Sequence, residues 1–191
     1  RVLLIDLDPQ GDISACHNTN AQYNLYHFLM ENASLSECTS KLGKNLDIVH
    51  CDHKMADAEH QIAKEKTSID FLSKKFSSQL NYDYILLDCP PSLRLLNKNA
   101  LFYATEVIIP TSTDILGYNS LEKTVKRIDE FNKMDGHKII ISSILPTMFD
   151  KRNNVCNEIL FKMRKEFTPL MVAEPIRVNS KLKEAPKAKM S

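Results

Sequence analysis

The chain has 191 residues, of which 43% are hydrophobic and 26% are charged, a balance typical of a folded domain with a substantial core. Its apolar runs are far shorter than the roughly 20 residues of a membrane helix, so no membrane association is expected. The net charge of +1 is unevenly distributed. Residues 151–191 carry ten Lys or Arg and four Asp or Glu, a net of +6, whereas residues 1–150 have a net of −5. This basic C-terminal part permits a surface for nucleic acid or an acidic partner.

The predicted strands follow one another in chain order, separated by helical patterns. Apolar runs predict strands at Val2–Ile5, Leu46–Val49, Ile85–Leu87, Val107–Ile109 and Ile139–Ile141. The last three runs have no polar alternation, as is typical of parallel strands sandwiched between helices. Five scattered cysteines without a C-x-x-C spacing indicate the reduced thiols of a cytoplasmic protein.

Two helices are predicted in the second half of the chain. After Asn119, an apolar stripe of Leu121, Val125, Ile128 and Phe131 recurs at helical spacing. A second helix is expected from Asn154 to Phe167, and loose order from Lys183 to Ser191. Strands alternating with helices predict an α/β fold, with a doubly wound, mostly parallel sheet covered by helices on both faces.

Two of the predicted strands run into acidic residues. The first leads into Asp6-Leu7-Asp8-Pro9-Gln10-Gly11, and the third leads into Asp88-Cys89-Pro90-Pro91-Ser92. In open parallel sheets, ligands bind at the carboxyl ends of the strands. Carboxylates at adjacent strand ends hold Mg²⁺ through its waters, and a further carboxylate orients an attacking water. The alternative is that acids merely end strands and cap helices, but two such strands, each followed by proline and a turn, favour a site.

Five segments, in the expected order, resemble motifs of the ParA/Soj/MinD family of deviant P-loop ATPases. Val2–Gly11 is similar to the deviant strand motif of this family, and Tyr82–Leu93 to its Walker B strand and switch. Glu106–Pro110 followed by Leu121 is similar to the next strand and helix. Thr147–Arg152 resembles TMxDxR, and Asn179–Pro186 resembles N-x-R-L-S-E-A-P.

The resemblance implies a role for each matching residue. Asp88 is expected to hold Mg²⁺ through water, Asp8 to position the hydrolytic water, and Asp6 to support the metal and phosphate shell. The nucleotide site is expected to include Gln10, the switch residues Pro90 and Pro91, and Asn179 near the adenine.

The resemblance also implies a biological activity. We expect a cytoplasmic, nucleoid-associated ATPase that uses ATP and Mg²⁺ in chromosome or plasmid partitioning. Its ATP-bridged homodimer would bind DNA without sequence preference, and a ParB-like partner would stimulate hydrolysis. The basic residues expected to contact DNA are Lys162, Arg164, Lys165, Lys181 and Lys183, and the alternative is a solvated helix face with a frayed tail.

The sequence departs from the family at the phosphate-binding loop. The four glycines are Gly11, Gly43, Gly117 and Gly136, and none lies in a G-x-x-x-x-G-K-[ST] pattern. We therefore expect residues 1–191 to form a single ParA-type domain that lacks its first strand and P-loop, is incomplete at both ends, and is inactive alone.

Two other functions remain open at this stage. One is a P-loop-less, non-catalytic module for dimerisation or DNA tethering, and the other is a MinD-like ATPase for positioning cell division. A MinD-like protein needs a C-terminal amphipathic helix, and the run Asp8-Pro9-Gln10-Gly11 favours ParA/Soj.

The run His50-Cys51-Asp52-His53 resembles a metal site. Only two of its residues, Cys51 and His53, could point the same way, and a closed metal site usually needs four ligands, so a structural role is favoured.

Overall fold

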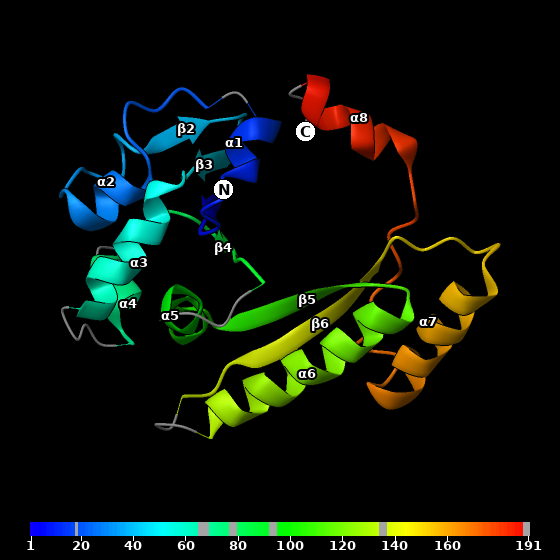
Figure 1. Cartoon of the computed structure of the whole chain (residues 1–191). Coiled ribbons are helices and arrows are strands. Elements are labelled where there is room, and N and C mark those ends of the chain that lie inside the picture. The colour runs from blue at the N-terminus through cyan, green and yellow to red at the C-terminus, as the bar shows by residue number, and fades with distance from the viewer. Residues whose placement is uncertain (18, 65–68, 77–79, 92–94, 134–136, 189–191) are drawn as a thin grey trace. The chain divides into compact units, whose positions relative to one another are not determined.

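The computed structural model describes residues 1–188 apart from 18, 65–68, 77–79, 92–94 and 134–136. The chain divides into two compact units (Figure 1). Unit 1 comprises Arg1–Tyr103 with Lys181–Ser191, and unit 2 comprises Ala104–Ser180. Both units combine parallel strands with helices, which confirms the predicted α/β class.

Unit 1 contains a four-stranded sheet in the order β2-β3-β1-β4. Its strands are β1 (Val2–Asp6), β2 (Thr39–Lys41), β3 (Leu46–Val49) and β4 (Tyr84–Asp88). β1 pairs in parallel with both β3 and β4, whereas β2 pairs antiparallel with β3. The central position of β1 explains why its apolar side chains Leu3 and Ile5 are fully buried. The parallel strands match the predicted runs, but β2 was not predicted.

Six helices in the part of the chain that the structure describes belong to unit 1. They are α1 (Asp12–Cys16), α2 (Leu25–Met30), α3 (Lys54–Lys64), α4 (Phe71–Lys75), α5 (Leu95–Tyr103) and, from its second residue, α8 (Ser180–Ala188). Four of them, α2 to α5, build one apolar core with this sheet. Leu25, Met55 and Leu72 from three of these helices are fully buried in the core. None of the helices within the described residues has both the length and the apolarity needed to cross a membrane.

Helix α8 corrects one prediction from the sequence. Loose order was expected from Lys183 onward, but the backbone is helical through Ala188. Pro186 lies inside this helix, where it removes one backbone hydrogen bond without ending the helix. Residues 189–191 of the expected loose segment lie outside the described residues.

Unit 2 contains two parallel strands that run side by side along one long helix (Figure 1). The strands are β5 (Glu106–Ser112) and β6 (Ile140–Thr147), and the helices are α6 (Ile115–Asn132) and α7 (Asn154–Glu166). Asp114 caps α6 by accepting the Gly117 N–H at 2.8 Å, which satisfies one of the free donors of the first turn. Leu121 and Ile128 of the predicted apolar stripe are buried, and Tyr118, which was not part of that stripe, is buried with them.

The strands that are apolar on both faces expose one of those faces. β4 is the outermost strand of its sheet, and the exposed fraction of Leu86 is 48%. In the two-stranded sheet, Ile108 and Ile140 are exposed by 54% and 57%. Their apolar pattern matches the parallel pairing of these strands within each unit.

Candidate functional site

The two acid-terminated strands lie next to each other and in register. β1 pairs with β4 so that Asp6 is directly opposite Asp88. The Leu7 N–H then donates to the Asp88 carbonyl at 2.9 Å, so the backbones stay together past the last paired residues. Because both strands are parallel, their carboxyl ends bring the acidic residues to one edge of the sheet, as predicted.

Asp6 is a fully buried carboxylate with one oxygen left unpaired. Its side chain is 0% exposed, and its Oδ1 accepts the Asp8 N–H at 3.0 Å, whereas Oδ2 has no hydrogen-bond partner among the described atoms. Burial raises the pKa of Asp6 from 3.8 to about 6, and the charge of Asp88 adds to the effect. A buried carboxylate oxygen without a donor is a group that a cation or its bound water would satisfy.

Asp8 lies on a tight loop directly after β1. Its Oδ1 accepts the Gln10 N–H at 3.0 Å, and its carbonyl oxygen accepts the Gly11 N–H at 2.9 Å. Gly11 has a φ of +67°, and a Cβ there would lie 2.9 Å from the Cys51 carbonyl oxygen. Glycine is therefore needed at position 11 both for its backbone conformation and for its close approach to Cys51.

Asp88 is the third predicted acid at this edge of the sheet, opposite Asp6 in the register of β1 and β4. Its pKa is raised by desolvation and then by the negative charges of Asp8 and Asp12. The described residues contain no cluster of three His, Cys, Asp or Glu side chains that could enclose a metal ion by themselves. The donor set nevertheless fits Mg²⁺, which takes one or two carboxylates and keeps several waters or phosphate oxygens.

The other residues predicted for the nucleotide site have fewer contacts that indicate their role. Gln10 is exposed beside Asp8. The Pro90 carbonyl accepts a 2.6 Å hydrogen bond from Asn97 Nδ2, so α5 holds the start of the predicted switch. Pro91 is exposed, and the next three residues of the predicted switch, 92–94, lie outside the described residues. Asn179 is exposed and belongs to unit 2, so its predicted place near adenine stays a prediction.

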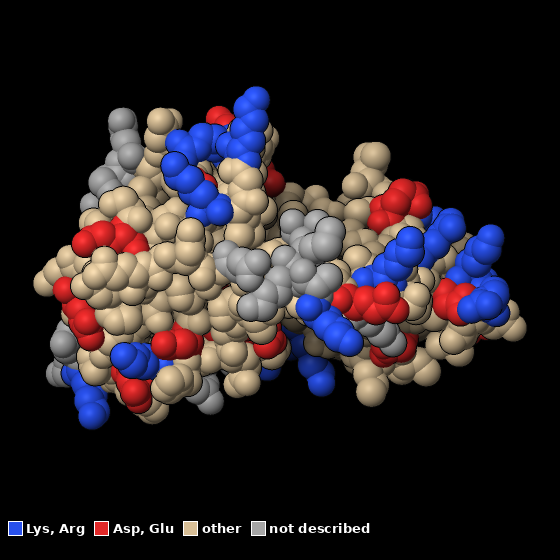
Figure 2. All heavy atoms as spheres, turned by 90° about the horizontal axis from the view of Figure 1, so that it is seen from above, with Lys and Arg blue, Asp and Glu red and all other residues tan. Residues whose placement is uncertain are grey.

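The basic residues predicted to contact DNA are spread over two helices in two different units. On α7, Lys162 Nζ lies 3.9 Å from the centre of the Tyr118 ring, and Arg164 pairs with Glu174 at 3.1 Å. Lys165 on α7 and Lys181 on α8 are exposed, and the Lys183 side chain lies outside the described residues. Figure 2 shows Lys and Arg side chains on the face in view, with Asp and Glu side chains lying among some of them.

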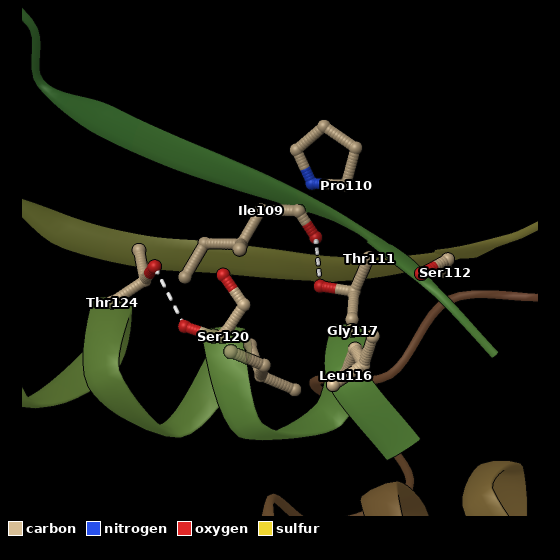
Figure 3. Close-up of a pocket in the computed structure, with 9 residues that line it drawn as sticks. Ile109, Pro110, Thr111, Ser112, Leu116, Gly117, Ser120 and Thr124 are labelled. Atoms are coloured by element: carbon tan, nitrogen blue, oxygen red, sulfur yellow. Dashed lines mark hydrogen bonds between the residues drawn. The ribbon is translucent and has the colours of Figure 1, made fainter. Parts of the chain in front are cut away.

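A hollow in unit 2 lies apart from the residues singled out in the sequence. It has a volume of about 320 Å³ and lies between β5 and α6, lined by small polar residues that include Thr111, Ser120 and Thr124 (Figure 3). The Thr124 hydroxyl already donates to the Ser120 carbonyl at 2.9 Å. No residue predicted to bind ATP or Mg²⁺ lines this hollow.

Comparison with known proteins agrees with the order of these motifs. The AAA_31 family, described as an AAA domain, matches residues 1–141. Bacillus subtilis Soj, the sporulation initiation inhibitor protein, is 29% identical over 191 residues, covering 97% of this chain and 76% of Soj. The chromosome partitioning protein ParA of Caulobacter vibrioides is 28% identical, covering 97% of this chain and 72% of ParA. The chain belongs to the ParA/Soj family.

A solved structure extends the likeness to the ParA/Soj fold. Cobyrinic acid a,c-diamide synthase from Mycobacterium smegmatis, with a bound ATP analogue and magnesium, superposes with a TM-score of 0.82 at 23% identity. The superposition covers 94% of this chain and 73% of that one. The predicted family and fold are therefore confirmed, and the relatives support an ATPase family with a role in partitioning.

The structure also places one residue in this site that sequence reasoning did not assign to it. Cys51 follows β3, and its Sγ lies 2.7 Å from the Asp8 carbonyl oxygen. In the sequence, Cys51 belongs to the run His50–His53, which resembles a metal site and for which a structural role is favoured. The separation of residues 8 and 51 along the chain gives no sign of the contact. The parallel pairing of β1 with β3 is what brings the two residues together.

Proposed function

We propose that this ParA/Soj family member is a partition ATPase that hydrolyses ATP at the carboxyl ends of β1 and β4. The observation that supports this most directly is the register of Asp6 with Asp88, together with the unpaired buried Oδ2 of Asp6. Acids that end two neighbouring parallel strands are placed where open α/β sheets bind their ligands.

Asp6, Asp8 and Asp88 would each have a different role in this reaction. Asp88, which is exposed at the end of β4, would hold Mg²⁺ through water, and the buried Asp6 would support the same shell from behind. Bound Mg²⁺ would neutralise charge on the phosphates. Asp8, whose Oδ1 is already oriented by the Gln10 N–H, would accept a hydrogen bond from the attacking water and set its direction.

The remaining nucleotide contacts would come from four residues outside this group of acids. Gln10 lies beside Asp8, and Pro90 and Pro91 follow Asp88, so these residues would sense the phosphate end of ATP. Asn179 would lie near adenine. The phosphates themselves need backbone N–H groups and a lysine such as a Gly-rich loop supplies, and residues 1–191 contain no such pattern.

The assembly that we propose is an ATP-dependent homodimer that binds DNA non-specifically and is stimulated by a ParB-like partner. The net charge of +6 over residues 151–191 supports attraction to DNA. The candidate contacts are Lys162, Arg164, Lys165, Lys181 and Lys183. Lys165 is the best candidate on α7, because Arg164 pairs with Glu174 and Lys162 lies over Tyr118.

The test compares two variants of the full-length protein, Asp8→Ala and Asp88→Ala. Asp8→Ala should keep ATP binding and lose turnover by about 10²–10⁴-fold, the usual cost of losing a group that positions water or moves a proton. Its ATP-bound form should then accumulate as a dimer on DNA. Asp88→Ala should weaken Mg²⁺-dependent ATP binding as well. Asp129→Ala, which changes an exposed acid of α6, is the control and should behave as the parent.

The measurements are ATP affinity, ATP hydrolysis and dimer mass, made side by side. Hydrolysis at the parental rate by Asp8→Ala would show that its catalytic role is wrong. Equal loss of ATP binding in both variants would refute the division of roles. A full-length parent that binds DNA but never ATP would favour the non-catalytic tethering module instead.

A further inference from the structure

Cys51 lies in the core at the point where the ends of β3 and β1 meet. Its side chain is 1% exposed, and its Sγ is 2.7 Å from the carbonyl oxygen of Asp8. This carbonyl belongs to the loop that carries the proposed water-positioning side chain. A thiol is a weak hydrogen-bond donor, but a buried one has no water to compete with it.

The same carbonyl is held from a second direction. The Gly11 N–H donates to the Asp8 oxygen at 2.9 Å, and Gly11 itself lies so close to Cys51 that a Cβ would be 2.9 Å from the Cys51 carbonyl oxygen. Cys51 therefore contacts the Asp8–Gly11 loop at both ends, through its side chain and through its backbone. The loop has little room to move on this side.

The surroundings of Cys51 keep its thiol protonated. Burial raises the pKa of this thiol far above its ordinary value, and the charge of Asp6 and a hydrogen bond with its carboxylate, followed by the charges of Asp52 and Asp8, add to the effect. A thiol that does not ionise keeps its S–H as a donor and does not act as a nucleophile or a metal ligand. The contact with Asp8 itself is given by the 2.7 Å distance between Sγ and the carbonyl oxygen.

We propose that Cys51 is a positioning residue that fixes the Asp8 loop from the end of β3. Its catalytic consequence rests on the proposed function of Asp8, whereas its effect on the loop does not. Removal of the thiol should free the Asp8 carbonyl, loosen the turn closed by Gly11, and allow the Asp8 carboxylate to adopt unproductive positions.

The first experiment needs no enzymatic activity. Amide hydrogen exchange of Gly11 is measured in the parent, Cys51→Ala and Cys51→Ser. Loss of one neutral hydrogen bond should speed exchange by about two- to tenfold in Cys51→Ala. Cys51→Ser keeps a hydroxyl donor and should restore slow exchange. Cys38→Ala removes an equally buried cysteine of the same core and should leave exchange at Gly11 unchanged.

The second experiment measures ATP hydrolysis by the same variants of the full-length protein. Cys51→Ala should lower kcat by about two- to tenfold with KM nearly unchanged, and Cys51→Ser should recover most of kcat. Equal behaviour of the Ala and Ser variants, or exchange at Gly11 that is unchanged in both, would overturn the role of Cys51. A parent without ATPase activity would overturn the proposed function, and the exchange rates would still decide whether Cys51 holds the loop.

Discussion

Asp6 should lower the stability of the protein near neutral pH, and Asp6→Asn should remove that cost. The side chain is 0% exposed, and its pKa is raised from 3.8 to about 6, chiefly by burial. Between these two values the folded state holds a proton that the unfolded state has released. The free energy of unfolding contributed by this group therefore falls as pH rises from 3.8 to 6, and it stays low above that.

The size of the effect follows from the two pKa values. With a pKa of about 6 in the folded state and 3.8 in the unfolded state, the burial of Asp6 lowers the free energy of unfolding by about 3 kcal/mol at pH 7.5 relative to low pH. About 0.5 kcal/mol of this decrease has already occurred at pH 4. Asparagine keeps the shape and the Oδ1 acceptor for the Asp8 N–H, but it buries a new N–H₂ donor. That donor costs about 1–3 kcal/mol at every pH, so the pH-dependent part of the difference is the informative quantity.

The assay is urea unfolding of the parent and Asp6→Asn, followed by circular dichroism at pH 4 and pH 7.5. The free energy of unfolding of the variant relative to the parent should increase by about 2–3 kcal/mol between the two pH values. Asp129→Asn, at an exposed acid, is the control for a general change in charge. A difference between Asp6→Asn and the parent that is the same at both pH values would refute the reasoning, because it would mean that burial does not penalise the Asp6 charge.

Two further predictions concern the nucleotide and the backbone. Residues 1–191 alone should bind ATP very weakly and not hydrolyse it, because they contain no Gly-rich phosphate loop; micromolar, Mg²⁺-dependent binding by calorimetry would contradict this. Gly117→Ala should lower the free energy of unfolding by about 1–3 kcal/mol, because its Cβ would lie 2.4 Å from the Ser112 carbonyl oxygen. Gly43→Ala is the matched control, since a Cβ there meets nothing within 4 Å, and equal stability of the two variants in urea would show that α6 shifts without cost.

The sequence predicted the parallel strands because their apolar runs are dense and end in recognisable acids. The prediction that Asp6, Asp8 and Asp88 lie at one edge of the sheet followed from one rule, that parallel strands share a carboxyl edge. Strand β2 escaped prediction because Thr39-Ser40-Lys41 has no apolar run, and its pairing with β3 is what makes it a strand. The local sequence pattern does not indicate which strand, if any, will pair with such a segment.

Helix α8 and Cys51 were missed for different reasons. The lysines and Pro186 of the last segment indicate a frayed end by composition, yet the backbone remains helical past this proline. Cys51 contacts Asp8 only because β3 lies beside β1, so no reading of neighbouring residues reveals the contact. The acidic residues of the site could be predicted from the sequence. The contact that holds the Asp8–Gly11 loop in place could not, because it depends on the order of the strands.

The outer edge of β4 affects how unit 1, taken by itself, behaves in concentrated solution. One side of Tyr84–Asp88 has no neighbouring strand in its sheet, and Tyr84 and Leu86 are exposed by 69% and 48%. Natural edge strands usually carry lysine, proline or a bulge that prevents another strand from pairing with them. The four residues that precede Asp88 in this strand offer none of these. An edge of this kind favours the addition of a further strand, so unit 1 taken by itself would be prone to pair with copies of itself through β4.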